Sequence, residues 1–183
     1  HYPLRRQRQM CIRDSCNITS LLTDEELLIQ KTANQFVAEE FNPIVNEYYE
    51  KGSFPLDLIS KMGELGFFGA TLPKKYGGSE ITSTAYGLIM QELEKGDSGL
   101  RSVCSVQGSL VMFPIYQYGT DKQKDKWLPL LAAGKAVGCF GLTESNHGSD
   151  PAGMLTRAKR DGDDWIINGL SLIHISEPTR RRG

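Results

Sequence analysis

The sequence predicts an α+β protein in which a helical domain comes first and a β region follows. Two observations lead to this fold class. Apolar residues recur at helical spacing over most of residues 16–135. From about residue 137 the chain changes to short apolar runs rich in β-forming residues, ending in two strand patterns joined at Asp161-Gly162-Asp163. We therefore expect a helical domain over 16–135 and the beginning of a β domain over 136–169.

The first helix is expected to begin after Thr23, because Thr23 and Glu26 have the spacing of a capping box. Its expected apolar stripe is Leu27, Leu28, Thr32, Phe36 and Val37. The next helical segment follows Pro43 and ends at Gly52, and another begins near Pro55 and ends at Gly66. The expected core face of the latter consists of Leu56, Ile59, Met62 and Leu65.

The proline and paired glycines of 73–78 predict a loop before the helical pattern resumes over 83–96. Asp97 and Ser98 suit the start of a further helix, which Pro114 should bend. The last predicted helix covers 120–134. The side chains expected to face inward are Leu88, Ile89 and Leu93 in the helix over 83–96, and Trp127, Leu130 and Leu131 in the last one.

Composition excludes several functional classes. The chain has 183 residues, 39% of them hydrophobic and 23% charged, as in soluble globular proteins. Its net charge of −1 suggests neither a nucleic-acid nor a membrane partner, and no apolar run reaches the roughly 18 residues of a membrane span. The four cysteines form neither a disulfide framework nor a metal-ligand pattern. A reducing compartment is expected, either a bacterial cytoplasm or the mitochondrial matrix.

Both ends of the chain differ in character from its middle. Residues 1–15 are rich in arginine and poor in acids, as in a mitochondrial transit peptide, but they lack amphipathic spacing. The strings MCIRDS and SLIHISEPTRR resemble translated sequencing-adapter DNA. We therefore expect 1–15 and 170–183 to be artefacts and the natural protein to occupy about 16–169. A true transit peptide and a true C-terminus are the alternatives.

The most specific motif is FGLTESNHGSDP, residues 140–151. Together with the helical segment before it, this string resembles the acyl-CoA dehydrogenase family, whose flavin-binding signature is aromatic-x-L-T-E-P-x-x-G-S-D. The resemblance covers about residues 18–169. It implies an N-terminal helical domain, the start of a β-barrel-like middle domain, and FAD as cofactor. The C-terminal helical bundle of that fold would be missing.

The resemblance also implies which residues contact the flavin. Backbone groups of a strand and the Thr143 hydroxyl would face the ring, Gly148 would permit close backbone approach, and Ser149 would lie near the phosphates and the acyl-CoA. The implied cofactor-binding residues are Phe140, Gly141, Leu142, Thr143, Glu144, Gly148 and Ser149. Ser145 stands where the family usually has proline. Taken alone, the Gly-Ser-Asp string is typical of a simple turn, and His147 is typical of a solvent-facing loop residue.

The string DSGLRSVCSVQGSLVM, which begins at Asp97, resembles the glutaryl-CoA dehydrogenase branch of the family. There the arginine corresponding to Arg101 meets the distal carboxylate of the substrate. Arg101, Ser102, Glu94 and Ser149 are the implied substrate-binding residues. A guanidinium suits this role, because it can donate two parallel charge-assisted hydrogen bonds to a carboxylate. The alternative is a surface arginine paired with Glu94 or Asp97.

The implied reaction is α,β-dehydrogenation of an acyl-CoA thioester, followed in glutaryl-type enzymes by decarboxylation to crotonyl-CoA. Its base is a glutamate of the C-terminal domain, so no residue of this chain is assigned as catalytic, and none as a metal ligand. We expect the chain alone to be inactive. Implied partners are an electron-transferring flavoprotein and three further copies in a homotetramer. A short-chain acyl-CoA dehydrogenase or oxidase, and a non-enzymatic helical interaction module, remain open alternatives.

Overall fold

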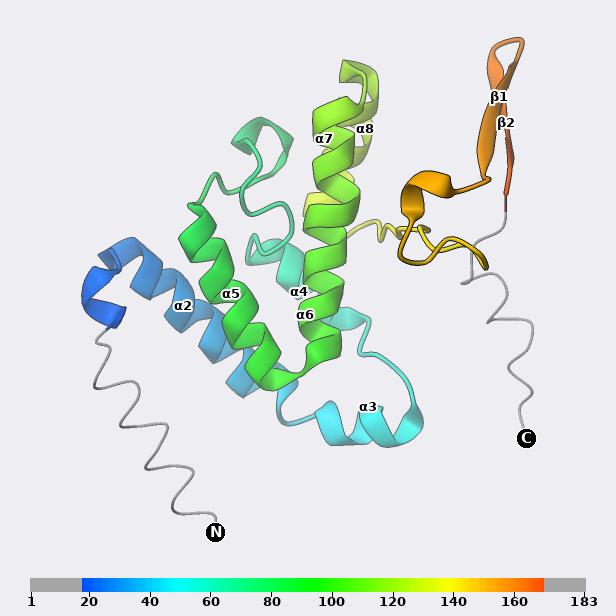
Figure 1. The fold of residues 1–183 in the computed structure, drawn as a ribbon. Coiled ribbons are helices and arrows are strands. Elements are labelled where there is room, and N and C mark those ends of the chain that lie inside the picture. Colours follow the sequence, from blue (N-terminus) through cyan, green and yellow to red (C-terminus); the bar gives the residue numbers. More distant parts are fainter. Residues whose placement is uncertain (1–17, 170–183) are drawn as a thin grey trace. The chain divides into compact units, whose positions relative to one another are not determined.

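The computed structural model describes residues 18–169, which belong to two compact units that divide between Gly138 and Cys139 (Figure 1). The expected artefact segments, 1–15 and 170–183, lie outside these residues. The helices of the first unit are α2 (Asp24–Phe36), α3 (Val45–Lys51), α4 (Asp57–Glu64), α5 (Ser83–Gly96), α6 (Ser98–Ser105), α7 (Phe113–Tyr118) and α8 (Asp121–Ala132). Two π-helical segments, η2 (Val37–Phe41) and η4 (Val106–Met112), and two short 3-10 turns, η1 (Ile18–Leu21) and η3 (Lys74–Tyr76), complete it. The predicted α+β class is confirmed.

The core of the helical unit lies where α2, α5 and α6 pack against one another and against the loop after α4 (Figure 1). The rings of Phe36 and Phe67 meet edge to face, with centroids 5.6 Å apart. Other fully buried side chains are Met62, Phe68, Leu93, Leu100, Cys104, Met112 and Leu128. Removing this apolar surface from water is the main stabilising contribution to the unit.

The capping box predicted at the start of α2 is confirmed, and it extends further than the sequence indicated. Glu26 Nα donates to Thr23 Oγ1 at 3.2 Å, and Thr23 Nα donates to Glu26 Oε2 at 3.0 Å. The other oxygen of Glu26, Oε1, accepts a 2.8 Å hydrogen bond from the hydroxyl of Thr82, which is itself the N-cap of α5. One carboxylate thus ties the starts of two helices together.

Glu92 is a buried carboxylate between α2 and α5, with 2% of its surface exposed. It accepts hydrogen bonds of 2.9 Å each from the side-chain amides of Gln30 and Asn34 on α2, and it pairs with Lys95 one turn further along α5. Burial by itself would raise the pKa of Glu92, but the hydrogen bonds from Lys95, Asn34 and Gln30 outweigh it and hold the pKa below its usual value.

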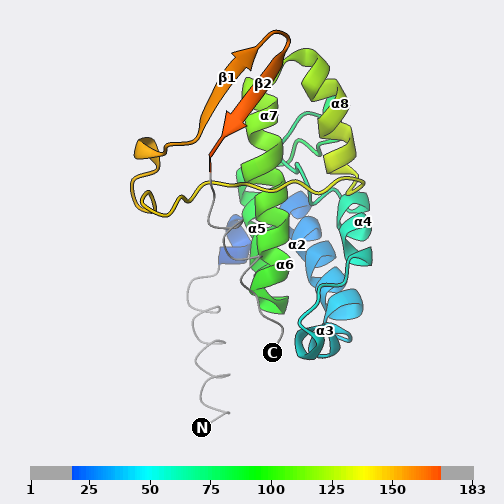
Figure 2. The ribbon, with the colours of Figure 1, turned by 90° about the vertical axis from the view of Figure 1, so that its right-hand side faces the viewer.

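The helix predicted after Asp97 exists and is long. Asp97 caps it, because its Oδ1 accepts hydrogen bonds from the backbone N–H groups of Gly99 at 2.7 Å and Leu100 at 3.3 Å. Segments α6, η4 and α7 follow one another without a break, and Figure 2 shows α6 and α7 along one axis. The departure from α-helical bonding is the π-helical η4, just before Pro114, which has no N–H to donate to the preceding turn.

Several side chains predicted to face the core lie at the surface instead. Leu56 is 73% exposed and Trp127 is 41% exposed, and Leu28, Leu65 and Leu130 are also exposed. In α4 the buried residues are Leu58, Ile59 and Met62, because the helix begins only at Asp57 and Leu56 precedes it. In α8 they are Leu128, Leu131 and Ala132. A wide apolar stripe does not determine which of its edges meets the neighbouring helix.

The second unit contains the predicted hairpin. Strand β1 (Arg157–Asp161) pairs antiparallel with β2 (Asp164–Asn168), and Asp161 lies opposite Asp164. Gly162 has a φ of 60°, which suits the first position of a two-residue hairpin loop. The strand expected in VGCFGLTE does not form a ladder among the described residues, which contain only an isolated bridge between Glu144 and His147. A strand needs a neighbour for its N–H and C=O groups, and no described segment supplies one.

Within residues 18–169, no helix has the length and apolar character needed to cross a membrane. The same residues contain no cluster of three or more His, Cys, Asp and Glu side chains placed to hold a metal ion.

Candidate functional site

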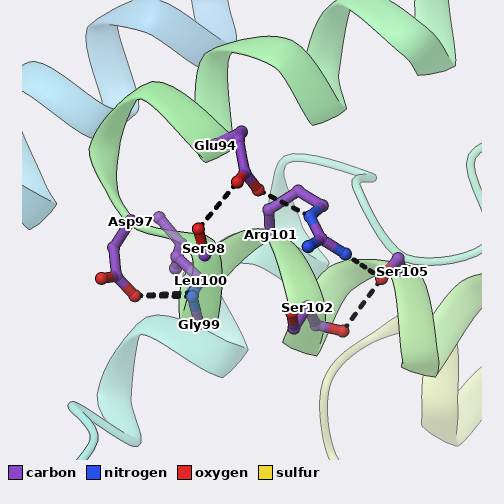
Figure 3. A network of polar contacts seen from close by, with 8 residues as sticks. All are labelled: Glu94, Asp97, Ser98, Gly99, Leu100, Arg101, Ser102 and Ser105. Carbon is purple, nitrogen blue, oxygen red and sulfur yellow. Dashed lines mark hydrogen bonds and ion pairs between the residues drawn. The ribbon is translucent and has the colours of Figure 1, made fainter.

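The corner between α5 and α6 brings together Glu94, Arg101 and Ser102, three of the four residues predicted to bind the substrate (Figure 3); Ser149 belongs to the second unit. Arg101 Nε donates a 2.7 Å hydrogen bond to Glu94 Oε2, which lies on the preceding helix. Arg101 Nη1 donates to the hydroxyl of Ser105, 3.3 Å away and one turn further along α6. Both contacts are part of one polar network at the corner, and they hold the guanidinium from two sides.

Glu94 is itself oriented by a second donor. The hydroxyl of Ser98, at the start of α6, donates to Glu94 Oε1 at 2.7 Å, so each carboxylate oxygen has a partner (Figure 3). The hydrogen bond from Arg101, followed by that from Ser98, holds the pKa of Glu94 below its usual value. Glu94 is therefore ionised at neutral pH, and Arg101 is a paired cation at a partly exposed surface.

The alternative considered for Arg101, an ion pair with Glu94, is present in the structure. That pair does not use the whole guanidinium, because within the described part of the chain Nη2 has no hydrogen-bond partner. A planar guanidinium held through Nε and Nη1 still offers N–H groups to a second acceptor. The geometry is thus compatible with both a structural ion pair and a carboxylate-binding role.

Ser102 and Ser105 have different roles in this network. Ser102 takes part through its backbone carbonyl, which accepts a 3.1 Å hydrogen bond from the Ser105 hydroxyl. Ser105, which sequence reasoning did not single out, is the serine whose hydroxyl contacts Arg101. Its position four residues after Arg101 places it on the same helical face, and this spacing was the signal available in the sequence.

A second hydroxyl pair lies further along the same two helices. The Tyr86 hydroxyl of α5 and the Ser109 hydroxyl of η4 are 3.2 Å apart. Partial burial raises the pKa of Tyr86 above its usual value. Ser109 lies four residues beyond Ser105, so the facing sides of α5 and the α6–η4 helix have polar groups over more than two turns.

The predicted flavin-binding segment belongs to the second unit. Residues 140–143 belong to no helix or strand, and two of their apolar side chains are exposed: Phe140 is 43% exposed and Leu142 is 39% exposed. Thr143 is partly buried, and Gly141 is exposed. Because residues 140–142 belong to no β ladder among the described residues, their backbone groups can meet a flat ligand.

Glu144 closes the loop that follows this segment. Its Oε2 accepts a 2.8 Å hydrogen bond from the backbone N–H of Leu155, and its Oε1 accepts from the N–H of Thr156 at 2.8 Å and from the Thr156 hydroxyl at 2.6 Å. The hydroxyl of Thr156, then the N–H groups of Leu155 and Thr156, hold the pKa of Glu144 below its usual value. The carboxylate therefore joins the start of the loop, at Glu144, to its end at Leu155 and Thr156.

Gly148 and Ser149 lie at the exposed part of that loop. A Cβ added to Gly148 would meet no atom within 4 Å, so the backbone there can be approached closely. His147 bridges Glu144 through backbone hydrogen bonds, and its ring lies beside Gly153, where an added Cβ would come within 2.7 Å of Nδ1. His147 is thus a turn residue packed within the loop.

The helical unit also has a separate, apolar groove of about 530 Å³ between α7 and α8. Its lining includes Ile115, Tyr118, Trp127 and Leu131, and no charged side chain contributes to it. Neither the Arg101 network nor the predicted flavin-binding residues line this groove. The groove therefore adds no chemistry to the candidate site.

Fold and residue pattern together define the class of protein: a helical domain and a two-stranded hairpin, with the motif of 140–151 between them, as in flavin-dependent acyl-CoA enzymes. The sequence profile described as "Acyl-CoA dehydrogenase, N-terminal domain" matches residues 23–135. The chain therefore belongs to the acyl-CoA dehydrogenase family.

Its relatives are considerably longer. A probable acyl-CoA dehydrogenase of Bacillus subtilis is 40% identical over 81% of this chain and 39% of its own length. The crystal structure of a glutaryl-CoA dehydrogenase from Mycobacterium smegmatis in complex with FADH2 is 52% identical over 82% of this chain, with a TM-score of 0.79 and 39% of that chain covered. Butyryl-CoA dehydrogenase from Megasphaera elsdenii is 38% identical, with a TM-score of 0.74 over 81% of this chain and 40% of that one. The present chain thus corresponds to about 40% of each.

Proposed function

We propose that this chain is the N-terminal part of an FAD-dependent enzyme that dehydrogenates glutaryl-CoA and decarboxylates the product to crotonyl-CoA. The observation that supports the proposal most strongly is the Arg101 network. It presents a guanidinium that is fixed by Glu94 and Ser105 and still has N–H groups to donate. The 52% identity with a glutaryl-CoA dehydrogenase agrees with this assignment.

In the proposed complex, Arg101 binds the distal carboxylate of the substrate. Hydrogen bonds to a charged group contribute about 1.5–3 kcal/mol each, and they are most effective when the donor is already oriented. Glu94 and Ser105 provide that orientation. Glu94 also balances the charge of Arg101 before the substrate arrives, and Ser102 supports Ser105 through its carbonyl.

The residues present fit the cofactor. The exposed residues 140–142 can lie against an isoalloxazine ring, Thr143 adds a hydroxyl, and the open surroundings of Gly148 leave room for phosphate or pantetheine beside Ser149. When bound, FAD would take up the hydride that leaves the β carbon of the substrate. Glu144 would hold the loop that carries Gly148 and Ser149.

No residue among those described is assigned as the base that removes the α-proton. The longer relatives have a region outside the part that this chain matches. We propose that the base lies in the equivalent of that region. We further propose a homotetramer, an electron-transferring flavoprotein as the electron acceptor, and a bacterial cytoplasm or mitochondrial matrix as the location.

The test is a chimera in which residues 18–169 replace the matching part of the Mycobacterium smegmatis enzyme. The expected result is a protein that retains FAD and oxidises glutaryl-CoA in preference to butyryl-CoA. A preference for butyryl-CoA would favour the alternative, a short-chain acyl-CoA dehydrogenase. The similarity to butyryl-CoA dehydrogenase supports that alternative. A folded chimera that binds no flavin would instead support a non-enzymatic helical module.

A further inference from the structure

Gln107, in the π-helical segment η4, has a side-chain amide that is almost completely buried, with 2% of its surface exposed. Its Nε2 donates two hydrogen bonds, to the carbonyl of Leu131 at 3.0 Å and to the carbonyl of Ala136 at 2.8 Å. Its Oε1 accepts a 3.0 Å hydrogen bond from the N–H of Gly138. Both donor hydrogens and the acceptor are thus used.

All three partners are backbone groups from one short stretch. Leu131 lies in the last turn of α8, where its carbonyl also accepts a 3.2 Å hydrogen bond from the N–H of Gly134, and Ala136 and Gly138 follow that helix. The amide fixes the positions of Ala136 and Gly138 in particular, because losing its bond to either one leaves that backbone group without its hydrogen-bond partner, at about 1–3 kcal/mol. Gln107 therefore determines where the chain runs after α8.

Val111 completes this arrangement by steric contact. A Cβ added to Gly138 would lie 2.8 Å from Val111 Cγ2 and 3.0 Å from Val111 Cβ, and closer still to Cγ1. Valine is stiff about χ1 and cannot easily move aside. Only glycine fits at position 138, and the chain there lies directly against η4. We call Gln107 and Val111 together the exit seat.

We propose that Gln107 is a positioning residue for the flavin-binding segment: through the exit seat it fixes Gly138, two residues before the run 140–143. The proposal rests on the proposed function of that run. Arg101 and Gln107 lie on one uninterrupted helix, α6 followed by η4. The helix that holds the substrate carboxylate thus also fixes the point from which the flavin-binding backbone leaves the helical unit.

The chemical reason for such a device is geometric. Hydride transfer requires that the reacting carbon lie close to the flavin, and a misplacement of about 1 Å can reduce a rate about 100-fold. The substrate is anchored at Arg101, so Gly138, the last residue of the helical unit before the flavin-binding segment, must keep a constant position relative to the Arg101 helix. Gln107 is a side chain of that same helix, and its hydrogen bond to Gly138 fixes this position directly, without an intervening segment.

The first measurement is amide hydrogen exchange by NMR in the chain itself. Replacing Gln107 by leucine should accelerate exchange at Gly138 by at least tenfold beyond the increase that the loss of global stability produces. Gly138→Ala, which displaces the chain from the same seat, provides a second variant if Gln107→Leu does not fold. Gln35→Leu removes a glutamine that binds Glu39 at the exposed surface and serves as the control, with no change expected at Gly138. Unchanged protection of the residue 138 amide in both seat variants, after correction for the intrinsic exchange rates of glycine and alanine, would overturn the proposal.

A conservative variant distinguishes positioning from bulk packing. In Gln107→Glu a carboxylate would face the carbonyl oxygens of Leu131 and Ala136, which raises its pKa above the unfolded value of about 4.3. Its stability deficit relative to the native chain should therefore shrink as pH falls toward 4 and grow as pH rises. A deficit that does not depend on pH would contradict the hydrogen-bonding role.

The second measurement uses the chimera described above. Gln107→Leu should lower kcat for glutaryl-CoA by about tenfold to 100-fold and leave KM within about threefold, because Arg101 is untouched. A purely structural role predicts a lower Tm with an unchanged kcat for each folded, flavin-loaded molecule, and that result would also overturn the proposal. If the unmodified chimera is inactive, the proposed function fails, while the exchange experiment still tests the exit seat.

Discussion

Arg101 and Glu94 lie on different helices, and the 2.7 Å hydrogen bond between Arg101 Nε and Glu94 Oε2 spans the corner that Asp97 caps. The two residues are seven positions apart in the sequence, about two helical turns, yet they meet because the chain reverses direction between them. The ion pair uses one edge of the guanidinium and leaves N–H groups on the other. Arg101 can therefore bind a substrate carboxylate through its remaining N–H groups although it is already paired with Glu94.

Replacing Arg101 by methionine in the chimera should lower kcat/KM for glutaryl-CoA by about 100-fold and leave butyryl-CoA within about twofold. The reason is the loss of about 3 kcal/mol of charge-assisted hydrogen bonding to the distal carboxylate, which butyryl-CoA lacks. Steady-state kinetics with both substrates measures the difference. Lys51→Met, which breaks an exposed ion pair with Glu47, is the control. An equal loss on both substrates would rule out glutaryl specificity through Arg101.

The 183-residue chain, purified alone, should contain no flavin and show no acyl-CoA oxidation. Residues 140–143 have no paired strand beside them among the described residues, and the hairpin β1–β2 exposes Trp165, Ile166 and Ile167. An isoalloxazine ring bound against residues 140–143 would therefore remain largely in contact with water. Visible absorbance after gel filtration in the presence of FAD gives the answer, and a yellow, active chain would refute the expectation.

Glu92 should contribute to stability in a pH-dependent way. Because its folded-state pKa is lowered, its stabilising effect is present above the unfolded value of about 4.3 and is lost as pH falls through the folded value. Replacing Glu92 by leucine should cost about 1–3 kcal/mol at pH 7 and much less at pH 3. Urea unfolding followed by circular dichroism at both pH values measures this. Glu39→Gln, at an exposed position of η2, should stay within about 0.5 kcal/mol of the native chain.

The loop that carries Gly148 and Ser149 should open in acid. The Thr156 hydroxyl and the N–H groups of Leu155 and Thr156 lower the pKa of Glu144, so these hydrogen bonds persist above about pH 4.3 and weaken as pH falls through the folded value. Amide exchange at Leu155 and Thr156, corrected for its intrinsic pH dependence, should accelerate in that range. In the Glu144→Gln variant, the amides of Leu155 and Thr156 should exchange quickly at neutral pH as well. Equal protection in Glu144→Gln and the native chain would show that the carboxylate does not hold the loop.

Local signals predicted much of the architecture. Thr23 with Glu26, Asp97, Gly52 and the Asp161–Asp164 turn each depend on hydrogen bonds or dihedral preferences within a few residues, so the sequence around them contains the relevant information. Motif resemblance led correctly to the family. The domain boundaries and the individual site residues stay predictions.

Contacts between distant segments were not accessible in the same way. The sequence did not indicate that Glu26 would also bind Thr82, that Glu92 would be buried against α2, or that Gln107 would bind three backbone groups. It also placed Leu56 and Trp127 in the core, where the structure has them exposed. Each of these outcomes depends on which face of one helix meets another.

The sequence by itself determined the helix starts and turns, the order of helical and β segments, and the family, because these follow from local chemistry and from a contiguous motif. Only the tertiary structure decided the partners of the buried polar groups, the contact of the Ser105 hydroxyl with Arg101, and the position of Gly138 against Gln107 and Val111. The physical reason is that burial and long-range hydrogen bonds depend on the packing of whole helices. An apolar or polar stripe narrows the possible packings but does not select one of them.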